Sequence, residues 1–390
     1  MTLRTALDRN TSTENLLDTH PEVSLDFRHV REALKAGYAK PFLLLDPGII
    51  RAKYRRFHAA MPRVHAHYAV KANPDPRVVR TLAGEGAGFE IASTAELDLL
   101  LSLGVPAAEV HYSNPVKARQ YIEYAAAKGV QWFSLDSVEE LNKIHAVAPG
   151  ARQYLRIDTP NIGSDWPLSG KFGAQPKEVE HILDAAAAIG ANLCGVTFHV
   201  GSQCRNAENW RIAIDNAKRV FRRMRLKGLT PTLLNIGGGF PVRLTKPIPS
   251  IEVIAEVVNA AIADVPDDIR VMAEPGRYLV SDAAYFVCRV IGTATRAGKR
   301  WVYLDTGMFG GLLESTQGLN YDLRTDRRGK LVPWHIAGPT CDSVDVLMQD
   351  QMLPEDLADD DFIYIPNAGA YTTAYASEFN GFPLPDVRLI

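Results

Sequence analysis

A lysine at the end of an apolar run is the first side chain in this sequence that could do covalent chemistry. Lys71 closes the segment 65–72, HAHYAVKA, which is typical of a β-strand. In a partly buried cleft, desolvation and cationic neighbours would lower the pKa of this amine. The amine would then be a nucleophile suited to forming a Schiff base. The alternative is a strand-end lysine that only reaches solvent.

Two further segments have the residue types of an anion site. Gly237, Gly238 and Gly239 follow a strand candidate, and three residues without Cβ let backbone N–H groups approach a phosphate closely. Elsewhere such a run would be a tight turn. Glu274-Pro275-Gly276-Arg277 ends the next strand candidate. Arg277 offers a guanidinium fork to the same phosphate, and Glu274 could keep a heterocyclic nitrogen protonated, although the two could instead form a structural ion pair.

Three other side chains complete the set of candidates. His199, in Phe198-His199-Val200-Gly201-Ser202, would point inward, as either a site residue or a hydrogen-bonded core histidine. Cys341 lies beside Asp342 in a loop-like stretch and is either a proton donor or an ordinary thiol. The hydroxyl of Tyr371 could reach a phosphate, or the ring could belong to the core of an edge strand.

Alternating strands and helices would bring these residues together. Eight strand candidates alternate with helical stretches, at 65–72, 88–93, 109–114, 131–136, 153–158, 195–201, 232–238 and 270–276. Ser93 to Glu96 and Ser137 to Glu140 have the pattern of capping boxes, where a strand gives way to a helix. We therefore predict a parallel (β/α)8 barrel of the α/β class. A doubly wound sheet would also alternate, but here the glycine run follows the seventh strand.

Active sites of such barrels lie at the carboxyl ends of the strands. A lysine, a phosphate loop, a glutamate for a ring nitrogen and a histidine at one rim together describe a pyridoxal phosphate site.

The pattern changes after about residue 277. Segments 284–307 and 359–375 alternate with period two and predict a C-terminal antiparallel β domain. Segment 40–48 precedes the barrel without a βα partner and is expected to join that domain. The predicted division is 47–277 for the barrel, with 1–46 and 278–390 for a discontinuous β domain.

Composition excludes several classes of protein. The 390 residues carry 43 basic and 45 acidic side chains, a net charge of −2, which gives no global field for nucleic acid or an anionic membrane. Four cysteines without zinc-ligand spacing predict no metal site and a reducing compartment. The N-terminus has no apolar signal region and no segment approaches a membrane span, so we expect a cytoplasmic protein.

Six motifs in order resemble one family. They are Tyr68–Asn73, His199–Ser202, Gly237–Pro241, Glu274–Arg277, Gly338–Asp342 and Gly369–Thr372. The set is similar to that of the ornithine/diaminopimelate/arginine decarboxylases, pyridoxal phosphate enzymes with the alanine-racemase-type fold. The similarity runs from about Lys40 to Phe382.

The resemblance implies a role for each matching residue. Lys71 would bind pyridoxal 5'-phosphate covalently, Glu274 would protonate its ring nitrogen and His199 would stack on its ring. The phosphate and the rest of the cofactor would be held by Ser202, Gly237, Gly238, Gly239, Arg277, Tyr371, Glu90 and Arg156. Cys341 would return a proton to Cα, while Asp342, Asp322 and Phe379 would bind substrate. In the family the Cys341 and Asp342 positions come from the neighbouring subunit, which implies a homodimer with shared sites.

The substrate that the resemblance implies is a basic L-amino acid. Gly-Pro-Thr-Cys-Asp with Asn380-Gly381-Phe382 resembles the ornithine decarboxylase branch. L-Ornithine giving putrescine is therefore the first expectation, and L-lysine, or both amino acids, is the alternative. A diaminopimelate decarboxylase, an amino-acid racemase and a non-catalytic binding relative are less favoured. Either Asp322 or Glu314 could be the second ligand of the distal amine.

Overall fold

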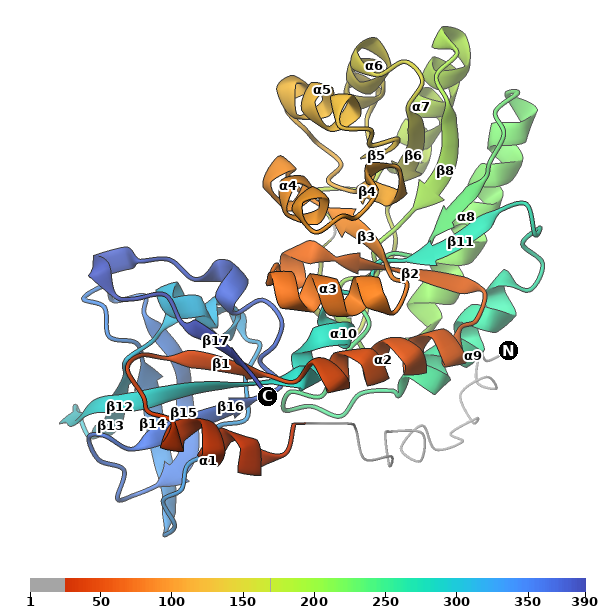
Figure 1. The fold of residues 1–390 in the computed structure, drawn as a ribbon. Helices are drawn as coiled ribbons and strands as arrows, with labels where there is room; N and C mark the ends of the chain where they lie inside the picture. Colours follow the sequence, from red (N-terminus) through yellow and green to blue (C-terminus); the bar gives the residue numbers. More distant parts are fainter. Residues whose placement is uncertain (1–24, 169) are drawn as a thin grey trace, which may run out of the picture.

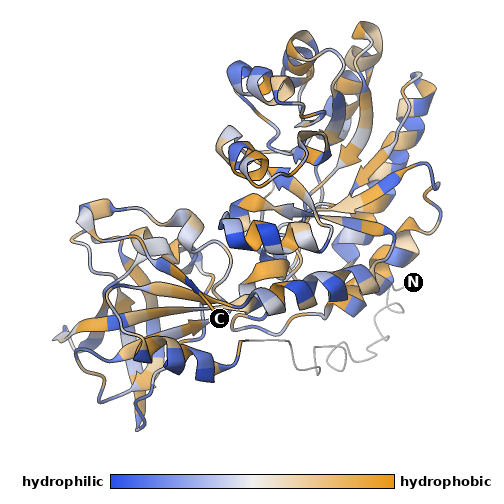
Figure 2. Cartoon of the chain, in the orientation of Figure 1, coloured by the Kyte–Doolittle hydropathy of each residue, from blue (hydrophilic) through white to orange (hydrophobic). Residues whose placement is uncertain are grey.

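The structure is a computed structural model that describes residues 25–168 and 170–390. Two bodies are evident in Figure 1, a barrel surrounded by helices and a sheet domain beside it. The strands of both bodies are mostly apolar, while the outward faces of the helices carry the polar residues (Figure 2). None of the helices in the described ranges is long and apolar enough to cross a bilayer.

Eight parallel strands form the closed barrel, as the alternation of strands and helices predicts. The ring runs β10-β11-β2-β3-β4-β5-β6-β8 and closes between β8 and β10. The strands are β2 (Val64–Ala69), β3 (Gly88–Ile91), β4 (Val110–Tyr112), β5 (Trp132–Leu135), β6 (Arg152–Arg156), β8 (Leu193–Thr197), β10 (Leu233–Asn235) and β11 (Arg270–Ala273). Each coincides with one of the eight strand candidates. A small two-stranded antiparallel sheet of β7 (Ser164–Trp166) and β9 (Ser202–Cys204) stands apart from this ring.

Helices cover the outside of the barrel (Figure 1). They are α2 (Pro47–Ala60), α3 (Pro76–Gly84), α4 (Thr94–Ser102), α5 (Arg119–Ala127), α6 (Val138–Val147), α7 (Pro176–Ile189), α8 (Glu208–Leu226) and α9 (Ile251–Ile262). Ser93 and Ser137 cap α4 and α6 by accepting hydrogen bonds from the backbone N–H of Glu96 and Glu140. The predicted return bond is wrong at Glu140, because its buried carboxylate binds the ammonium of Lys117 at 2.9 Å.

The second body is a seven-stranded sheet that contains the first and the last strand of the described chain. Its strands are β1 (Phe42–Leu45), β12 (Ala284–Arg296), β13 (Lys299–Leu304), β14 (Leu331–Ala337), β15 (Val346–Pro354), β16 (Phe362–Pro366) and β17 (Asp386–Leu389). The early strand β1 pairs antiparallel with β12, with Leu43 opposite Phe286, so segment 40–48 does join this domain. The sheet is mostly antiparallel, but β13–β14 and β1–β17 are parallel pairs that the period-two pattern cannot distinguish.

The helix α1 (Phe27–Lys35) lies against this sheet, where Phe27 contacts the ring of Tyr364 at 4.8 Å between centroids. The division at residues 47 and 277 stays a prediction, and residues 1–24 of its outer segment lie outside the described ranges.

The chain passes between the two bodies directly after β11. A short helix, α10 (Arg277–Val280), and a 3-10 turn, η4 (Ser281–Ala283), connect the barrel to β12. Asp282 in this turn makes a buried ion pair with Lys53 of α2, at 2.5 Å between Oδ2 and Nζ. The connecting segment therefore fixes Arg277 at the barrel rim that faces the sheet domain.

Candidate active site

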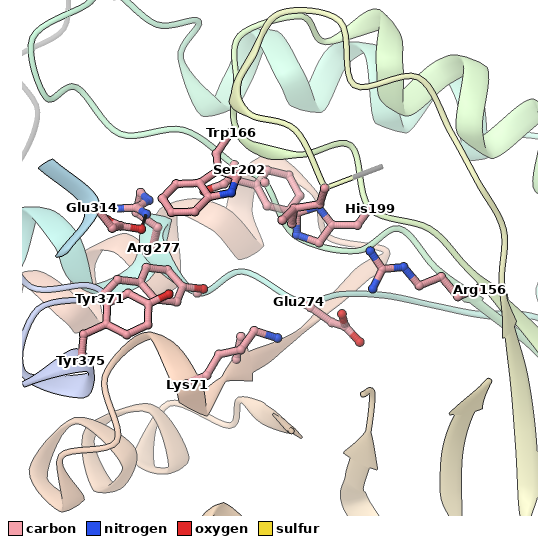
Figure 3. Close-up of a pocket in the computed structure, with 15 residues that line it drawn as sticks. Lys71, Arg156, Trp166, His199, Ser202, Glu274, Arg277, Glu314, Tyr371 and Tyr375 are labelled. Carbon is pink, nitrogen blue, oxygen red and sulfur yellow. Dashed lines mark hydrogen bonds and ion pairs between the residues drawn. The ribbon is translucent and has the colours of Figure 1, made fainter. Parts of the chain in front are cut away.

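A cavity of about 250 Å³ opens at the carboxyl ends of the barrel strands, beside the sheet domain. Figure 3 shows its polar side chains. Lys71 and His199 approach from opposite sides, with Glu274 and Arg156 toward one end and Arg277, Glu314 and Tyr371 toward the other. The cavity therefore has an end suited to a ring nitrogen and an end suited to a phosphate.

Lys71 follows β2 in a single 3-10 turn, η2 (Val70–Ala72), which aims its side chain into the cavity. Its Nζ lies 3.0 and 3.1 Å from the two carboxylate oxygens of Glu90 on β3. The predicted lowering of its pKa is wrong in this structure. Burial does oppose the charged ammonium, but the Glu90 carboxylate outweighs it and raises the pKa of Lys71.

Glu90 is the natural acceptor for the proton that Lys71 must lose to become a nucleophile. Its side chain is 1% exposed. Burial raises the pKa of Glu90 to about 7, although the charge of Lys71 works in the opposite direction. Because the pKa of Lys71 is raised as well, the proton stays on the lysine amine in this pair at neutral pH.

Glu274 follows β11 and is held by two donors on one oxygen. Ser113 Oγ and Asn235 Nδ2 each donate to Oε1 at 2.6 Å. This arrangement leaves Oε2 as the oxygen available to a protonated ring nitrogen in the cavity. Glu274 makes no ion pair with Arg277, so the structural-pair alternative is wrong.

A hydroxyl relay beneath Glu274 was missed by the sequence analysis. Ser113 donates to Glu274, so the Tyr154 hydroxyl at 2.7 Å donates to Ser113. Strand alternation could have identified Ser113, because His111 and Ser113 are two residues apart and face the same side. The strand candidate 109–114 ends one residue later, at Asn114.

His199 is a neutral ring on the far side of the cavity. Its Nδ1 accepts a hydrogen bond from the backbone N–H of Gly201 at 3.0 Å. Burial, together with the charges of Arg156 and Lys71, lowers the pKa of His199 to about 3. The ring can therefore pack against another ring without carrying charge.

The glycine run forms a cradle that only glycine fits. A Cβ at Gly237 would lie 2.0 Å from the Phe198 carbonyl oxygen, and one at Gly239 would lie 2.3 Å from that of Gly201. Both residues have positive φ, at 66° and 93°. At the third glycine, Gly238, a Cβ would lie 2.7 Å from the Glu274 carbonyl oxygen and 3.2 Å from Nε2 of His199. Of the three glycines, Gly239 lines the cavity, and the phosphate-binding role of the run stays a prediction.

Arg277 is buried and only partly satisfied by the protein. Its Nη2 donates to Glu314 Oε1 at 2.5 Å, whereas Nε and Nη1 have no hydrogen-bond partner. Buried, unpartnered guanidinium N–H groups are costly unless an anion receives them. The Tyr371 ring lies 4.8 Å from the guanidinium, and burial raises the pKa of its phenol to about 12, so the hydroxyl stays a donor. These donors fit a phosphate group at this end of the cavity.

Glu314, rather than Asp322, reaches the cavity of this chain. Glu314 lies in the turn η6 (Leu313–Gln317), and the Tyr321 hydroxyl is 3.4 Å from its Oε2. Asp322 points elsewhere and pairs with Arg324 at 3.0 Å. The other predicted cofactor residues, Arg156 and Ser202, do line the cavity.

The remaining predicted residues gather on the sheet domain, outside this cavity. Cys341 Sγ lies 3.5 Å from Asn380 Oδ1, and Phe379 packs on Phe309 with 4.3 Å between ring centroids. Asp342 accepts the backbone N–H of Val344 at 3.0 Å. Cys341 is exposed, and Phe379 is 40% exposed. We call Cys341, Asp342, Phe379 and Asn380 the cysteine patch.

Comparison with known proteins identifies the family. The family model described as "Pyridoxal-dependent decarboxylase, pyridoxal binding domain" matches residues 48–281, and the model of the C-terminal sheet domain of the same enzymes matches residues 277–369. The chain belongs to the pyridoxal-dependent decarboxylases. This family membership agrees with the barrel, the sheet domain and the cofactor that the sequence predicts.

Named relatives of this decarboxylase cover most of its length. A lysine/ornithine decarboxylase of Selenomonas ruminantium is 36% identical over 88% of both chains. An ornithine decarboxylase of Schizosaccharomyces pombe is 37% identical over 87% of this chain and 81% of that one. A solved lysine/ornithine decarboxylase of Vibrio vulnificus, complexed with cadaverine, superposes with a TM-score of 0.86 at 36% identity, covering 93% of this chain and 98% of that one.

The side chains of this decarboxylase fit pyridoxal phosphate. The unpartnered donors of Arg277 and the cradle of Gly237 to Gly239 suit its phosphate, and the free oxygen of Glu274 suits its ring nitrogen. The amine of Lys71, which lines the same cavity, suits its aldehyde. The residues that the structure describes include no group of three or more His, Cys, Asp or Glu able to hold a metal ion.

Proposed function

We propose that this enzyme decarboxylates a basic L-amino acid, with L-ornithine as the preferred substrate and L-lysine as the alternative. The observation that carries the proposal is the joint placement of the Lys71 amine, the free oxygen of Glu274 and the free donors of Arg277 around one cavity. When bound, pyridoxal phosphate supplies an electron sink conjugated to the substrate Cα, which permits the bond from Cα to the carboxylate to break.

The residues of the chain perform the proton transfers and the positioning. Lys71 would hold the cofactor through its amine, and Glu90, whose carboxylate lies 3.0 Å from that amine, would orient it. Glu274 keeps a proton on the ring nitrogen, with Ser113 and Asn235 fixing its orientation. His199 would pack against the cofactor ring as a neutral group.

The cysteine patch acts in the cavity of a second copy of the chain. The thiol of Cys341 returns a proton to Cα after CO₂ leaves, Asp342 binds the distal ammonium and Phe379 packs against the aliphatic part of the substrate. Two features support this arrangement. The patch lies outside the cavity of its own chain, and exposed apolar side chains such as Val344, at 55%, adjoin it. The enzyme is accordingly a homodimer with two shared sites.

The product from ornithine is putrescine, so the enzyme serves polyamine synthesis. We also propose a cytoplasmic location. The four cysteines are unpaired, which suits a reducing compartment.

Parallel measurement of CO₂ release from L-ornithine, L-lysine, L-arginine and meso-diaminopimelate, with added cofactor, tests the proposal. We expect ornithine to be fastest and lysine second, since one methylene is worth about 1–3 kcal/mol in a fitted pocket. Release from neither ornithine nor lysine, or racemised substrate without CO₂, would contradict the proposed reaction.

A further inference from the structure

A second open cavity, of about 420 Å³, lies at the opposite end of the barrel from the active site. Its wall is formed by residues at the amino ends of the strands, including Trp132 of β5, Arg152 of β6 and Arg270 of β11. Asn192 and Thr230 contribute polar groups from the loops, and Cys194 lies beside them. The proposed decarboxylation makes no use of this end of the barrel.

Both arginines in this cavity are held in defined positions. The guanidinium of Arg152 stacks over Trp132 at 5.1 Å, and that indole is itself stacked on His111. Arg270 Nη2 lies 3.1 Å from Nε2 of His67. An arginine only donates, so Nε2 of His67 accepts and this histidine is neutral. These contacts already restrict the two arginine side chains. Binding a ligand therefore costs less conformational entropy than it would at a free surface arginine.

The positive charge of the cavity is poorly compensated by the protein. Within the described ranges, no carboxylate lies within ion-pair distance of Arg152, and the Glu109 carboxylate, 62% exposed, is 3.9 Å from Arg270. The barrel interior behind the arginines holds the side chains of His65, His67 and His111. Burial lowers the pKa of each, and Arg270 lowers it further. Both ring nitrogens of the fully buried His111 lack a hydrogen-bond partner.

We propose that this cavity binds a phosphate group between Arg152 and Arg270. Two guanidinium groups match the charge of a phosphate dianion and present forked donors to its oxygens. The Asn192 amide and the Thr230 hydroxyl supply neutral donors at the rim. The group belongs to free inorganic phosphate or to a small phosphate ester, because the cavity is open on one side.

Calorimetric titration of the holoenzyme tests this site. The cofactor is first fixed with borohydride so that the phosphate cradle of the active site stays filled. Inorganic phosphate and glycerol 3-phosphate are then titrated separately, with ionic strength held constant. We expect saturable binding of one ligand per chain, and a loss of affinity of about tenfold or more in Arg152→Gln and in Arg270→Gln.

The control is Arg225→Gln, which removes the same charge from the exposed surface of α8 and should bind as the wild type does. If Arg270→Gln fails to fold without its bond to His67, Arg152→Gln still decides, since its guanidinium has no ion-pair partner to lose. Binding of glycerol 3-phosphate alone would assign the site to phosphate esters, and binding of inorganic phosphate alone would assign it to the free ion. No saturable binding of either, or unchanged binding in Arg152→Gln, would overturn the proposal.

Discussion

Replacing Glu314 by Gln should destabilise the enzyme much more without its cofactor than with it. Glu314 and Arg277 form a buried pair whose side chains are 5% and 4% exposed. Removing one partner of such a pair leaves the other charge buried and uncompensated. In the holoenzyme the cofactor phosphate would take over part of that compensation, since Nε and Nη1 of Arg277 are free to bind it.

The size of the difference follows from the cost of breaking a buried pair, about 3–5 kcal/mol. The amide of Gln keeps one acceptor for Arg277, so we take the lower end, about 3 kcal/mol, for the cofactor-free protein. With phosphate beside Arg277 we expect the variant to lose about 1 kcal/mol of folding stability, the net contribution of a typical hydrogen bond. The difference of about 2 kcal/mol corresponds to roughly 30-fold tighter cofactor binding in the variant.

Thermal unfolding of both forms measures the effect, with cofactor titration as a second readout. The melting temperature of the cofactor-free variant should fall by roughly 4 °C. Asp282→Asn is the matched control, because it breaks the buried pair with Lys53, which does not line the active-site cavity. This control should lower the melting temperatures of the cofactor-free protein and the holoenzyme equally. If Glu314→Gln also lowered the two melting temperatures equally, or bound the cofactor more weakly than the wild type, the reasoning would be refuted.

Three further predictions concern the proton chemistry and the assembly. Mixing Lys71→Ala with Cys341→Ala should restore up to about one quarter of wild-type activity, since half the dimers are mixed and each has one intact site; no recovery after subunit exchange would contradict shared sites. Ser113→Ala should lower kcat about tenfold with little change in KM, because Glu274 keeps one of its two donors; an unchanged kcat would remove Ser113 from the mechanism. The pKa of His199 is lowered from 6.5 to about 3, so unfolded protein binds more protons there and stability should fall as the pH drops through that window. His199→Asn should show a shallower fall in urea-unfolding experiments, and parallel pH profiles would contradict this assignment.

The barrel and the rim residues were predictable because they depend on local patterns. The spacing of hydrophobic residues indicates which segments are strands and which are helices. In a parallel barrel the carboxyl ends of the strands must meet at one rim. Lys71, His199, Glu274 and Arg277 could therefore be assigned to one site from the order of the strands alone.

Contacts between distant segments were not predictable in the same way. Glu314, which binds Arg277, lies in irregular turns. The path of such turns cannot be predicted from hydrophobic periodicity. The pKa of Lys71 depends on Glu90, whose distance from the amine is set by the register of β2 and β3. The parallel strand pairs of the sheet domain depend on long connections. In a sheet with one exposed face, side chains alternate in the same way in parallel and antiparallel pairs, so the pattern does not reveal strand direction.

Borohydride reduction of the holoenzyme followed by peptide mapping tests the central claim most directly. A pyridoxyl group on the peptide that contains Lys71, in about one copy per chain, is the predicted result. A pyridoxyl group on another lysine, or no labelled peptide from protein that retains bound cofactor, would contradict the assignment of Lys71 and the site built around it.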